Sequence, residues 1–448
     1  MRIKRTFRLQ HPSEFKAQLL EWSDRCQEVV WLDGNDISDK YSNYDAILAA
    51  DVFTAIKTDE VAGFDKLEEY QQATRDWIFG YLTYDLKNDT ESLSSNNEDG
   101  LGFPALYFFQ PVKLFLIRNN VVELHYLRMA EEEMEEDFSQ ILAMADTTST
   151  FPEIGSSARG KTFEIIPSLT KREYLTRVEE MLVHIKRGDI YEANMCQEFH
   201  VTGETIRPLK VFKALDAISK APFSVFLKLE AYHLLCASPE RYLQKRGSRL
   251  ISQPIKGTAP RADDPQIDSE LMKLLEEDPK ERAENVMIVD LVRNDLSRTA
   301  KRGSVKVEEL CGIYSFKQVH QMISTVSCQM PEDASVVDPL RHTFPMGSMT
   351  GAPKIQAMKI IEKLENSKRG LYSGAVGYFD PSGDFDFNVV IRSILYNSAR
   401  KYISFSVGGA ITAASDPEKE YQECMVKARA MRQVLEQELG EPLLSSGL

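Results

Sequence analysis

The chain of 448 residues is 43% hydrophobic and 27% charged, which is typical of folded globular protein with one large domain or two to three average ones. Its 54 basic and 68 acidic residues give a net charge of −14, which argues against general nucleic-acid binding. The basic start lacks the apolar core of a signal peptide, and no apolar run approaches the ~18 residues of a membrane span. We therefore expect a cytoplasmic protein with no membrane partner, and its six scattered cysteines favour reduced thiols.

The first part of the chain alternates short strand-like runs with helical stretches. The runs predicted as strands are VVWL, WIFGYLTY, ALYFF and VKLFLI. Residues 86–100 are predicted as an exposed loop, and an acidic helix starting at Ala130 runs into a Ser/Thr/Gly-rich linker. We place the organisational boundary in this linker, which divides the chain into residues 1–160 and 161–440.

The second part continues with helices and paired strands. REYLTRVEEMLVHIKRG is predicted as an amphipathic helix, FSVFLKL and YHLLCAS as one strand pair, and RYLQKR and RLISQPI as another. Pairing of neighbouring strands indicates antiparallel sheets, and no repeat of solenoid length is visible. The fold class predicted from the pattern is therefore mixed α/β with antiparallel sheets.

Two helix starts share the same signal, an Asp followed by a Pro, at residues 278 and 416. Each start is followed by two glutamates three residues apart: Glu281 and Glu284, then Glu420 and Glu423. Mg²⁺ prefers oxygen ligands and usually takes one or two carboxylates plus water and substrate, so two such helices could hold it. The same pattern is also typical of solvated acidic helix faces.

Three segments offer groups that could bind an anion. GSMTGAPK is a Gly-containing turn entering a helix, but it lacks the P-loop pattern and could be an ordinary tight turn. SVGGAITAAS is predicted as a small-residue turn, with a β-bulge or packed crossing as the alternative. Arg392 in FNVVIRSILY is predicted within an apolar strand, where its charge needs a structural Glu or a substrate carboxylate.

Three further residues could carry chemistry. Lys256 lies in QPIKGTAPR, a segment predicted as a turn that allows close backbone approach to a ligand. His320 stands between apolar residues in VHQMIST and is either a satisfied core histidine or a catalyst. Glu240 in SPE follows a predicted strand, where it could be only a turn carboxylate.

Taken together, these segments resemble the chorismate-utilising enzyme family. The resemblance is strongest over residues 165–432, through GDIYEANMCQEF, SPERYL, QPIKGTAPR, KERAENVMIVDLVRNDLSR, VHQMIST, GSMTGAPKIQAM, YSGAVGYF, IRS and DPEKEYQE. It implies an α+β fold, an α/β sandwich of large antiparallel sheets wrapped by helices, with the N-terminal part packed into the same body. It also implies an enzyme that acts on chorismate with Mg²⁺ as cofactor.

The resemblance assigns roles to individual residues. The expected metal ligands are Glu284 and Glu423, with Glu281 and Glu420 alongside. The expected catalytic residues are Lys256, Glu240 and His320. The expected chorismate contacts are Gly257, Thr258, Thr350, Tyr372, Arg392, Gly408, Gly409, Ala410 and Lys427, where Ala410 replaces the family's usual third glycine. Because hydroxide is a poor leaving group, loss of the 4-hydroxyl of chorismate needs a proton donor and a cation.

Two positions bear on which reaction the chain performs. Lys256 in PIKGT is similar to the aminodeoxychorismate synthase pattern, whereas anthranilate synthases have PIAGT. Glu192 stands where members that activate water have lysine and amine-transferring members usually have Gln, so its role is left open. The segment APFSVFLK lacks the run typical of a tryptophan-feedback pocket, so we do not predict tryptophan inhibition, and whether a tryptophan is bound as a structural piece is left open.

We therefore expect amination of chorismate to 4-amino-4-deoxychorismate, with Lys256 as a nucleophile in a site that favours its uncharged form. The chain lacks the glutamine amidotransferase signature GxCxGHQ, so a separate glutaminase subunit is the expected source of ammonia. Anthranilate synthesis is the nearest alternative. An alternative of another class is a non-catalytic metabolite-binding regulator on the same fold.

Overall fold

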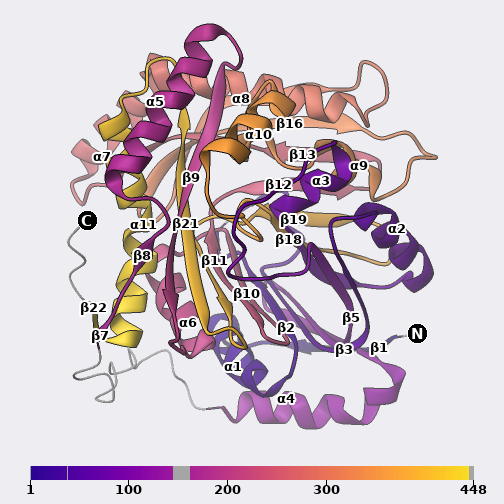
Figure 1. The fold of residues 1–448 in the computed structure, drawn as a ribbon. Helices are drawn as coiled ribbons and strands as arrows, with labels where there is room; N and C mark the ends of the chain where they lie inside the picture. Colours follow the sequence, from indigo (N-terminus) through magenta and orange to yellow (C-terminus); the bar gives the residue numbers. More distant parts are fainter. Residues whose placement is uncertain (1, 38, 145–161, 443–448) are drawn as a thin grey trace.

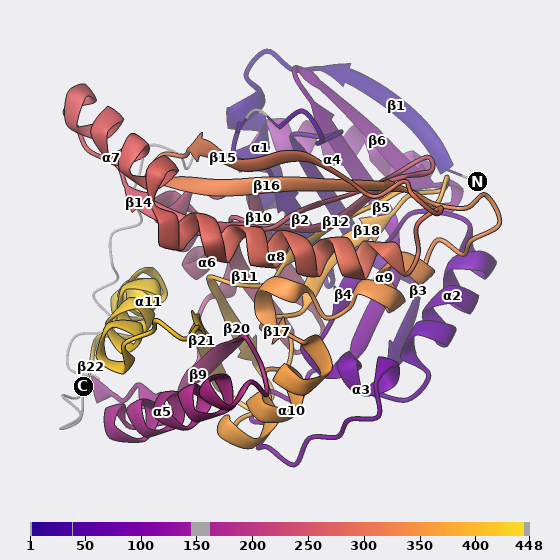
Figure 2. The same ribbon diagram turned by 90° about the horizontal axis from the view of Figure 1, so that it is seen from above.

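The structure is a computed structural model that describes residues 2–37, 39–144 and 162–442, and it places most strands in one connected antiparallel sheet of 20 strands (Figure 1). This agrees with the predicted class, large antiparallel sheets with helices around them. In Figure 2, α8 runs alongside β16, while α5, α10 and α11 pack near β9, β17 and β21. Among the described residues, no helix is long and apolar enough to cross a bilayer.

The N-terminal part supplies six strands and four helices to this body. Its strands are β1 (Arg2–Arg8), β2 (Val29–Asp33), β3 (Ala46–Thr58), β4 (Ile78–Leu82), β5 (Leu106–Arg118) and β6 (Val121–Leu127). Its helices are α1 (Pro12–Trp22), α2 (Gly63–Thr74), α3 (Lys87–Thr90) and α4 (Met134–Leu142). The two strands predicted at ALYFF and VKLFLI are one strand, β5, and the loop predicted at residues 86–100 begins with the short helix α3.

The C-terminal part supplies the remaining strands of the sheet. They are β8 (Ile166–Pro167), β9 (Glu192–Thr202), β10 (Phe223–Leu229), β11 (Tyr232–Ser238), β12 (Arg241–Arg246), β13 (Arg249–Gln253), β14 (Ile255–Pro260), β15 (Lys306–Ser315), β16 (Val319–Gln329), β17 (Gly351–Ala352), β18 (Ala375–Phe379), β19 (Phe385–Val389), β20 (Ser393–Asn397) and β21 (Tyr402–Ile411). Two short strands, β7 (Thr162–Phe163) and β22 (Glu441–Pro442), form a separate parallel pair.

Seven helices accompany these strands. They are α5 (Lys171–Arg187), α6 (Pro208–Ser219), α7 (Pro265–Glu277), α8 (Pro279–Ser297), α9 (Asp338–Thr343), α10 (Lys354–Leu364) and α11 (Pro417–Leu439). The predicted amphipathic helix is α5, which starts with a capping box between Thr170 and Glu173 and ends at Gly188 with φ 82°. The predicted strand pairs are confirmed as β10 with β11 and β12 with β13.

The two parts of the chain share the sheet. Strand β4 pairs with β18, and β2 pairs with β10, so N-terminal strands lie between C-terminal ones. The boundary predicted at residue 160 lies outside the described residues. The shared pairing nevertheless places both sides of that boundary in one body, as the resemblance implied.

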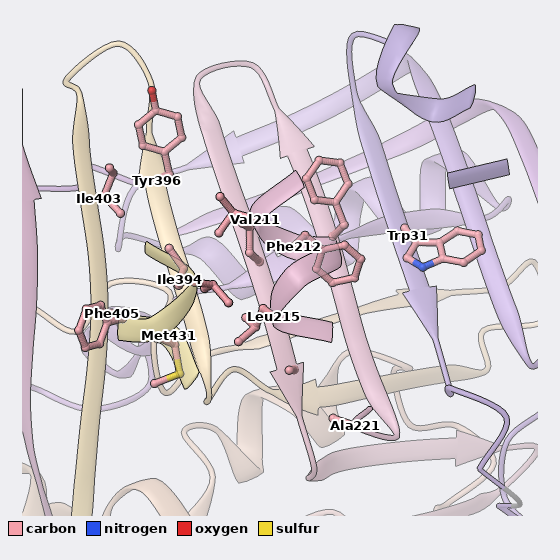
Figure 3. Close-up of a cluster of buried hydrophobic side chains, with 14 of the residues drawn as sticks. Trp31, Val211, Phe212, Leu215, Ala221, Ile394, Tyr396, Ile403, Phe405 and Met431 are labelled. Atoms are coloured by element: carbon pink, nitrogen blue, oxygen red, sulfur yellow. The ribbon is translucent and has the colours of Figure 1, made fainter. Parts of the chain in front are cut away.

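The sheet is covered by helices through large apolar clusters. Figure 3 shows one of them, in which Phe212 and Leu215 of α6 and Met431 of α11 face sheet residues such as Ile394 and Phe405. Each fully buried side chain of this kind contributes about 1.5–3 kcal/mol relative to exposure. All six cysteines lie among the described residues, and each is buried and free, as predicted for reduced thiols.

Candidate active site

The two predicted acidic helix starts are present as helices α8 and α11. The Asp278 side chain accepts hydrogen bonds from the backbone N–H groups of Lys280 (2.8 Å) and Glu281 (3.0 Å). The Asp416 side chain accepts one from the backbone N–H of Lys419 (3.0 Å). These caps fix the first turn of each helix, and the glutamates of both helices follow directly.

The four glutamates of α8 and α11 lie within electrostatic reach of one another. Burial raises the pKa of Glu281, Glu284 and Glu420, and neighbouring carboxylates raise each of these values further. Burial also opposes ionisation of Glu423, but the ammonium of Lys427 holds its pKa below the ordinary value. Crowded carboxylates of this kind favour binding of a cation.

The glutamates of α8 and α11 could supply one or two ligands to Mg²⁺, with water and substrate completing its coordination. In the described part of the chain, no three His, Cys, Asp or Glu side chains are arranged to hold a metal ion by themselves. Lys280 Nζ lies 3.7 Å from Glu284 Oε1, and Lys427 Nζ lies 2.6 Å from Glu423 Oε1. Since Mg²⁺ usually keeps several waters and takes one or two carboxylates, this donor set is compatible with the predicted magnesium.

Lys256 lies in strand β14, so the turn predicted for QPIKGT is wrong. The register between β14 and β16 shifts between Ile255 and Thr258, and Gly257 has φ +96°, which an L side chain rarely adopts. The glycine therefore allows a bulge beside Lys256. A Cβ added at Gly257 would lie 3.3 Å from Glu281 Oε2, so the bulge packs against the acidic helix α8.

The amine of Lys256 is held by a buried carboxylate. Lys256 Nζ donates a hydrogen bond to Glu192 Oε1 over 2.9 Å, from β14 to the first residue of β9. Burial opposes the positive charge, but the charges of Glu192, Glu284 and Glu240 hold the pKa of Lys256 above its ordinary value. The surrounding carboxylates thus favour the charged amine, which differs from the uncharged form that the sequence led us to expect.

Glu240 lies between β11 and β12 with its side chain buried. Ser348 Oγ donates a hydrogen bond to Glu240 Oε1 over 2.7 Å. Burial raises the pKa of Glu240 to about 7, although Ser348 and Lys256 oppose this shift. A carboxyl group with this pKa can donate a proton near neutral pH. A cavity of about 20 Å³ borders Glu240 and Ser348 and has room for about one water.

Arg392 lies in a break between β19 and β20, not within a strand as predicted. Its backbone has φ 52°, a left-handed conformation that costs energy for a side chain of this size. Burial lowers the pKa of its guanidinium, while Tyr372 and Glu423 act in the opposite direction. No hydrogen bond or ion pair from the rest of the described chain satisfies this guanidinium, so it is available to an anion.

The small residues Gly408, Gly409 and Ala410 form the end of strand β21, so the turn predicted there is wrong. They pair with residues 194–196 of β9. Lys427 Nζ donates a hydrogen bond to the carbonyl oxygen of Gly408 over 2.8 Å. A Cβ at Gly409 would lie 3.1 Å from Glu420 Oε2, so glycine keeps this strand end open toward helix α11.

The other predicted site residues differ in whether their side chains already have hydrogen-bond partners within the protein. Both ring nitrogens of His320 are occupied, by Asp268 (3.0 Å) and Ser315 (2.8 Å), which is the pattern of a satisfied core histidine. Thr350 Oγ1 donates to backbone carbonyl oxygens of the preceding turn, and Thr258 is exposed. Tyr372 is buried, and its hydroxyl accepts a contact from the Cys196 thiol. Roles for these residues stay predictions.

The sequence alone does not reveal which residues pair with Glu240 and Lys256. Ser348, which contacts Glu240, is 108 residues away from it. Glu192 is 64 residues away from Lys256. Only the fold brings each pair together, through the strand ends of β9 and β14 and the segment before β17.

Comparison with known proteins defines the class. A family model described as chorismate binding enzyme matches residues 20–433. The chain therefore belongs to the chorismate binding enzyme family. The fold agrees: the anthranilate synthase component I from Streptococcus pneumoniae TIGR4 superposes with a TM-score of 0.74 at 24% identity, covering 88% of this chain and 93% of that one.

Curated relatives carry two kinds of name. The aminodeoxychorismate synthase of Streptomyces griseus is 43% identical over 59% of this chain, and aminodeoxychorismate synthase component 1 of Escherichia coli (strain K12) is 41% identical over 60%. The chain spans 36% and 59% of these two proteins. Anthranilate synthase component 1 2 of Haloarcula marismortui is 32% identical over 96% of this chain and 79% of its own length.

Proposed function

We propose that the chain aminates chorismate at C4 to give 4-amino-4-deoxychorismate, using ammonia and Mg²⁺. The observation that carries this proposal is the position of Lys256, whose amine lies within reach of the charges of Glu192, Glu240 and Glu284. A potential nucleophile, a potential acid and a potential metal ligand thus share one site. The 43% and 41% identity to two aminodeoxychorismate synthases, each over about 60% of the chain, supports the same choice.

Chorismate carries two carboxylates, and the site offers cations for them. Arg392 has a partly buried guanidinium without a hydrogen-bond or ion-pair partner among the described residues, and Tyr372 lies near enough to influence its pKa. We assign one substrate carboxylate to Arg392, supported by the open strand end at Gly409. When bound by the glutamates of α8 and α11, Mg²⁺ would neutralise the second carboxylate and draw electron density from the ring.

The chain's own residues account for the proton and bond changes. The uncharged amine of Lys256 attacks C2, the ring double bonds shift, and the C4–O bond breaks. Glu240 gives its proton to the departing oxygen, so that water leaves rather than hydroxide. Ammonia then adds at C4, the C2–N bond breaks, and Lys256 departs as the free amine.

A separate glutaminase is the proposed source of ammonia, and a cytoplasmic location stays a prediction. The purified chain should use ammonium salts but not glutamine, and glutamine-dependent turnover should appear only when a glutaminase subunit is added. Glutamine-dependent turnover by the purified chain alone would contradict this part of the proposal.

The test of the reaction is identification of the product by mass. Purified chain, chorismate, Mg²⁺ and ammonium should yield 4-amino-4-deoxychorismate. Anthranilate as the product would favour the alternative supported by the Haloarcula marismortui relative. Binding of chorismate without any consumption would favour a non-catalytic metabolite-binding regulator.

A further inference from the structure

The partner of Lys256 is a deeply buried carboxylate with one free oxygen. The side chain of Glu192 is 2% exposed and that of Lys256 is 13% exposed. Oε1 of Glu192 accepts the hydrogen bond from Lys256 Nζ, whereas its Oε2 is buried and has no hydrogen-bond partner in the described structure. A buried carboxylate oxygen without a partner is costly, so it calls for a function.

A nucleophilic lysine must first lose a proton, and the charged groups around Lys256 differ in their ability to take it. Glu192 on β9 is the acceptor in hydrogen-bond contact with Nζ among the described residues. Glu284 on α8 and Glu240 before β12 act on Lys256 through their charge. Glu240 is the proposed proton donor to the leaving oxygen, and Glu284 is a proposed metal ligand. Glu192 has no such competing task.

We propose that Glu192 takes the proton from Lys256 as the amine attacks C2 and returns it when the lysine is expelled. This inference rests on the proposed function. The Lys256 ammonium gives one proton to the Glu192 carboxylate, and the resulting uncharged amine forms the C2–N bond. After ammonia adds at C4 and the C2–N bond breaks, Glu192 gives the same proton back. Ammonium supplies the proton that restores Glu240, so protons and charge balance over the cycle.

The two oxygens of Glu192 suit this exchange. The proton crosses the Nζ–H···Oε1 hydrogen bond and arrives on Oε1, and the uncharged amine can then turn a remaining N–H toward Oε2, which holds it in place. The nitrogen lone pair then remains free to attack C2. The free Oε2 therefore has a use in the reaction, whereas a purely structural ion pair would have no need for it.

The competing explanation is that Glu192 is only a fixed counter-ion that orients Lys256. The two explanations predict opposite pH behaviour for Glu192→Gln, which keeps shape and an acceptor oxygen but cannot take a proton. Its turnover is compared with wild type at each pH with ammonium as nitrogen source. The contribution of Glu240 is common to both proteins, so the ratio of variant to wild type removes it.

If Glu192 takes the proton, the variant must release the Lys256 proton to solvent. The ratio should then rise with pH and be at least about tenfold lower near pH 6.5 than near pH 8.5. If Glu192 is only a counter-ion, its removal lowers the pKa of Lys256 and increases the uncharged amine. The variant would then exceed wild type, most strongly at low pH, and the proposal would be overturned. A ratio that does not change with pH also overturns it.

Two controls keep the result specific. Glu198→Gln changes another buried glutamate of β9, which accepts hydrogen bonds from Ser404 and Tyr402, and should leave the ratio independent of pH. Glu192→Asp keeps an acid and should show a weaker pH dependence than Glu192→Gln; equal dependence in both would contradict the proposal. If wild type forms no 4-amino-4-deoxychorismate, the proposed function is overturned together with the role of Glu192. If wild type is active, the pH dependence of Glu192→Gln tests the role of Glu192 alone.

Discussion

Two arginines, Arg241 on β12 and Arg392 between β19 and β20, differ in how their charge is satisfied. Arg241 on β12 has a fully buried side chain and forms ion pairs with Asp39 (2.6 Å) and Asp386 (2.9 Å), with further hydrogen bonds to Gln253 and Ser42. Arg392 has no such partner within the described structure and sits on backbone with φ 52°. The first cluster stabilises the fold, whereas the second leaves a cation for something the chain does not itself supply.

The same difference separates the two regions around these residues. Near Arg241, polar groups pair with one another across the N-terminal and C-terminal strands. Near the glutamates of α8 and α11, burial raises the pKa of Glu281 and Glu284, and neighbouring carboxylates raise these values further. Such an arrangement supports the proposal that chorismate binds in this region.

The largest effect is expected from Lys256→Ala. Removal of the nucleophile should reduce turnover by roughly 10³-fold or more, while chorismate affinity changes little because other groups hold its carboxylates. Steady-state turnover and direct chorismate titration measure the two quantities. Equal losses in both would assign Lys256 to substrate binding instead.

The next effect is expected from Glu284→Gln, which removes a full charge from the proposed magnesium site. Turnover at limiting Mg²⁺ should fall by about 100-fold or more, with partial recovery at high Mg²⁺. Asp290→Asn on the same helix is a matched control, because Asp290 is exposed and pairs with Arg293 at the surface. Wild-type activity of Glu284→Gln at limiting Mg²⁺ would contradict the metal assignment.

Arg241→Met should lower the free energy of unfolding by about 2–4 kcal/mol, because it leaves the partly buried carboxylates of Asp39 and Asp386 without their cation. Chemical denaturation measures this change. An unfolding free energy equal to that of wild type would show that these aspartates do not depend on Arg241.

Arg392→Met should have the opposite pattern to Arg241→Met, with an effect on chorismate affinity and not on stability. Its loss leaves no protein partner unpaired, so the free energy of unfolding should be unchanged or higher. Chorismate affinity should fall by roughly 30–100-fold, the value of a charge-assisted carboxylate contact of about 2–3 kcal/mol. Loss of stability without loss of affinity would place Arg392 with Arg241 among the structural residues.

The smallest expected effect is a shift in pH dependence. Since the pKa of Glu240 is about 7 and the protonated form donates, turnover should fall by up to about tenfold per pH unit above that value. Ser348→Ala removes a hydrogen bond that lowers this pKa, so the decline should move to higher pH. If turnover of Ser348→Ala declines at the same pH as wild type, Glu240 is not the proton donor.

The sequence predicted local features well where the signal lies within one element. The Asp-Pro helix starts, the capped helix α5 and the hairpin pairs follow from residues that are neighbours in the chain. It failed where partners from elsewhere decide the conformation. QPIKGT and SVGGA contain glycines typical of turns, yet pairing with β16 and β9 makes both of them strands.

The site shows the same limit. The sequence indicated Lys256, Glu240 and the four glutamates, but it could not indicate that Glu192 pairs with Lys256 across 64 residues. It also could not indicate that the Lys256 pKa is raised, because that depends on three carboxylates from different elements. Both features depend on which strands and helices lie side by side in the fold, which the periodicity of hydrophobic residues does not reveal.

The most direct test of the central claim is a mass measurement on the Lys256 peptide. Wild-type protein held with chorismate and Mg²⁺ but without ammonia, and trapped under several conditions, should gain the mass of chorismate less one water on that peptide. The Lys256→Ala protein should gain none. Turnover with ammonium, together with no adduct under any trapping condition, would contradict the nucleophile and favour direct attack of ammonia on the ring.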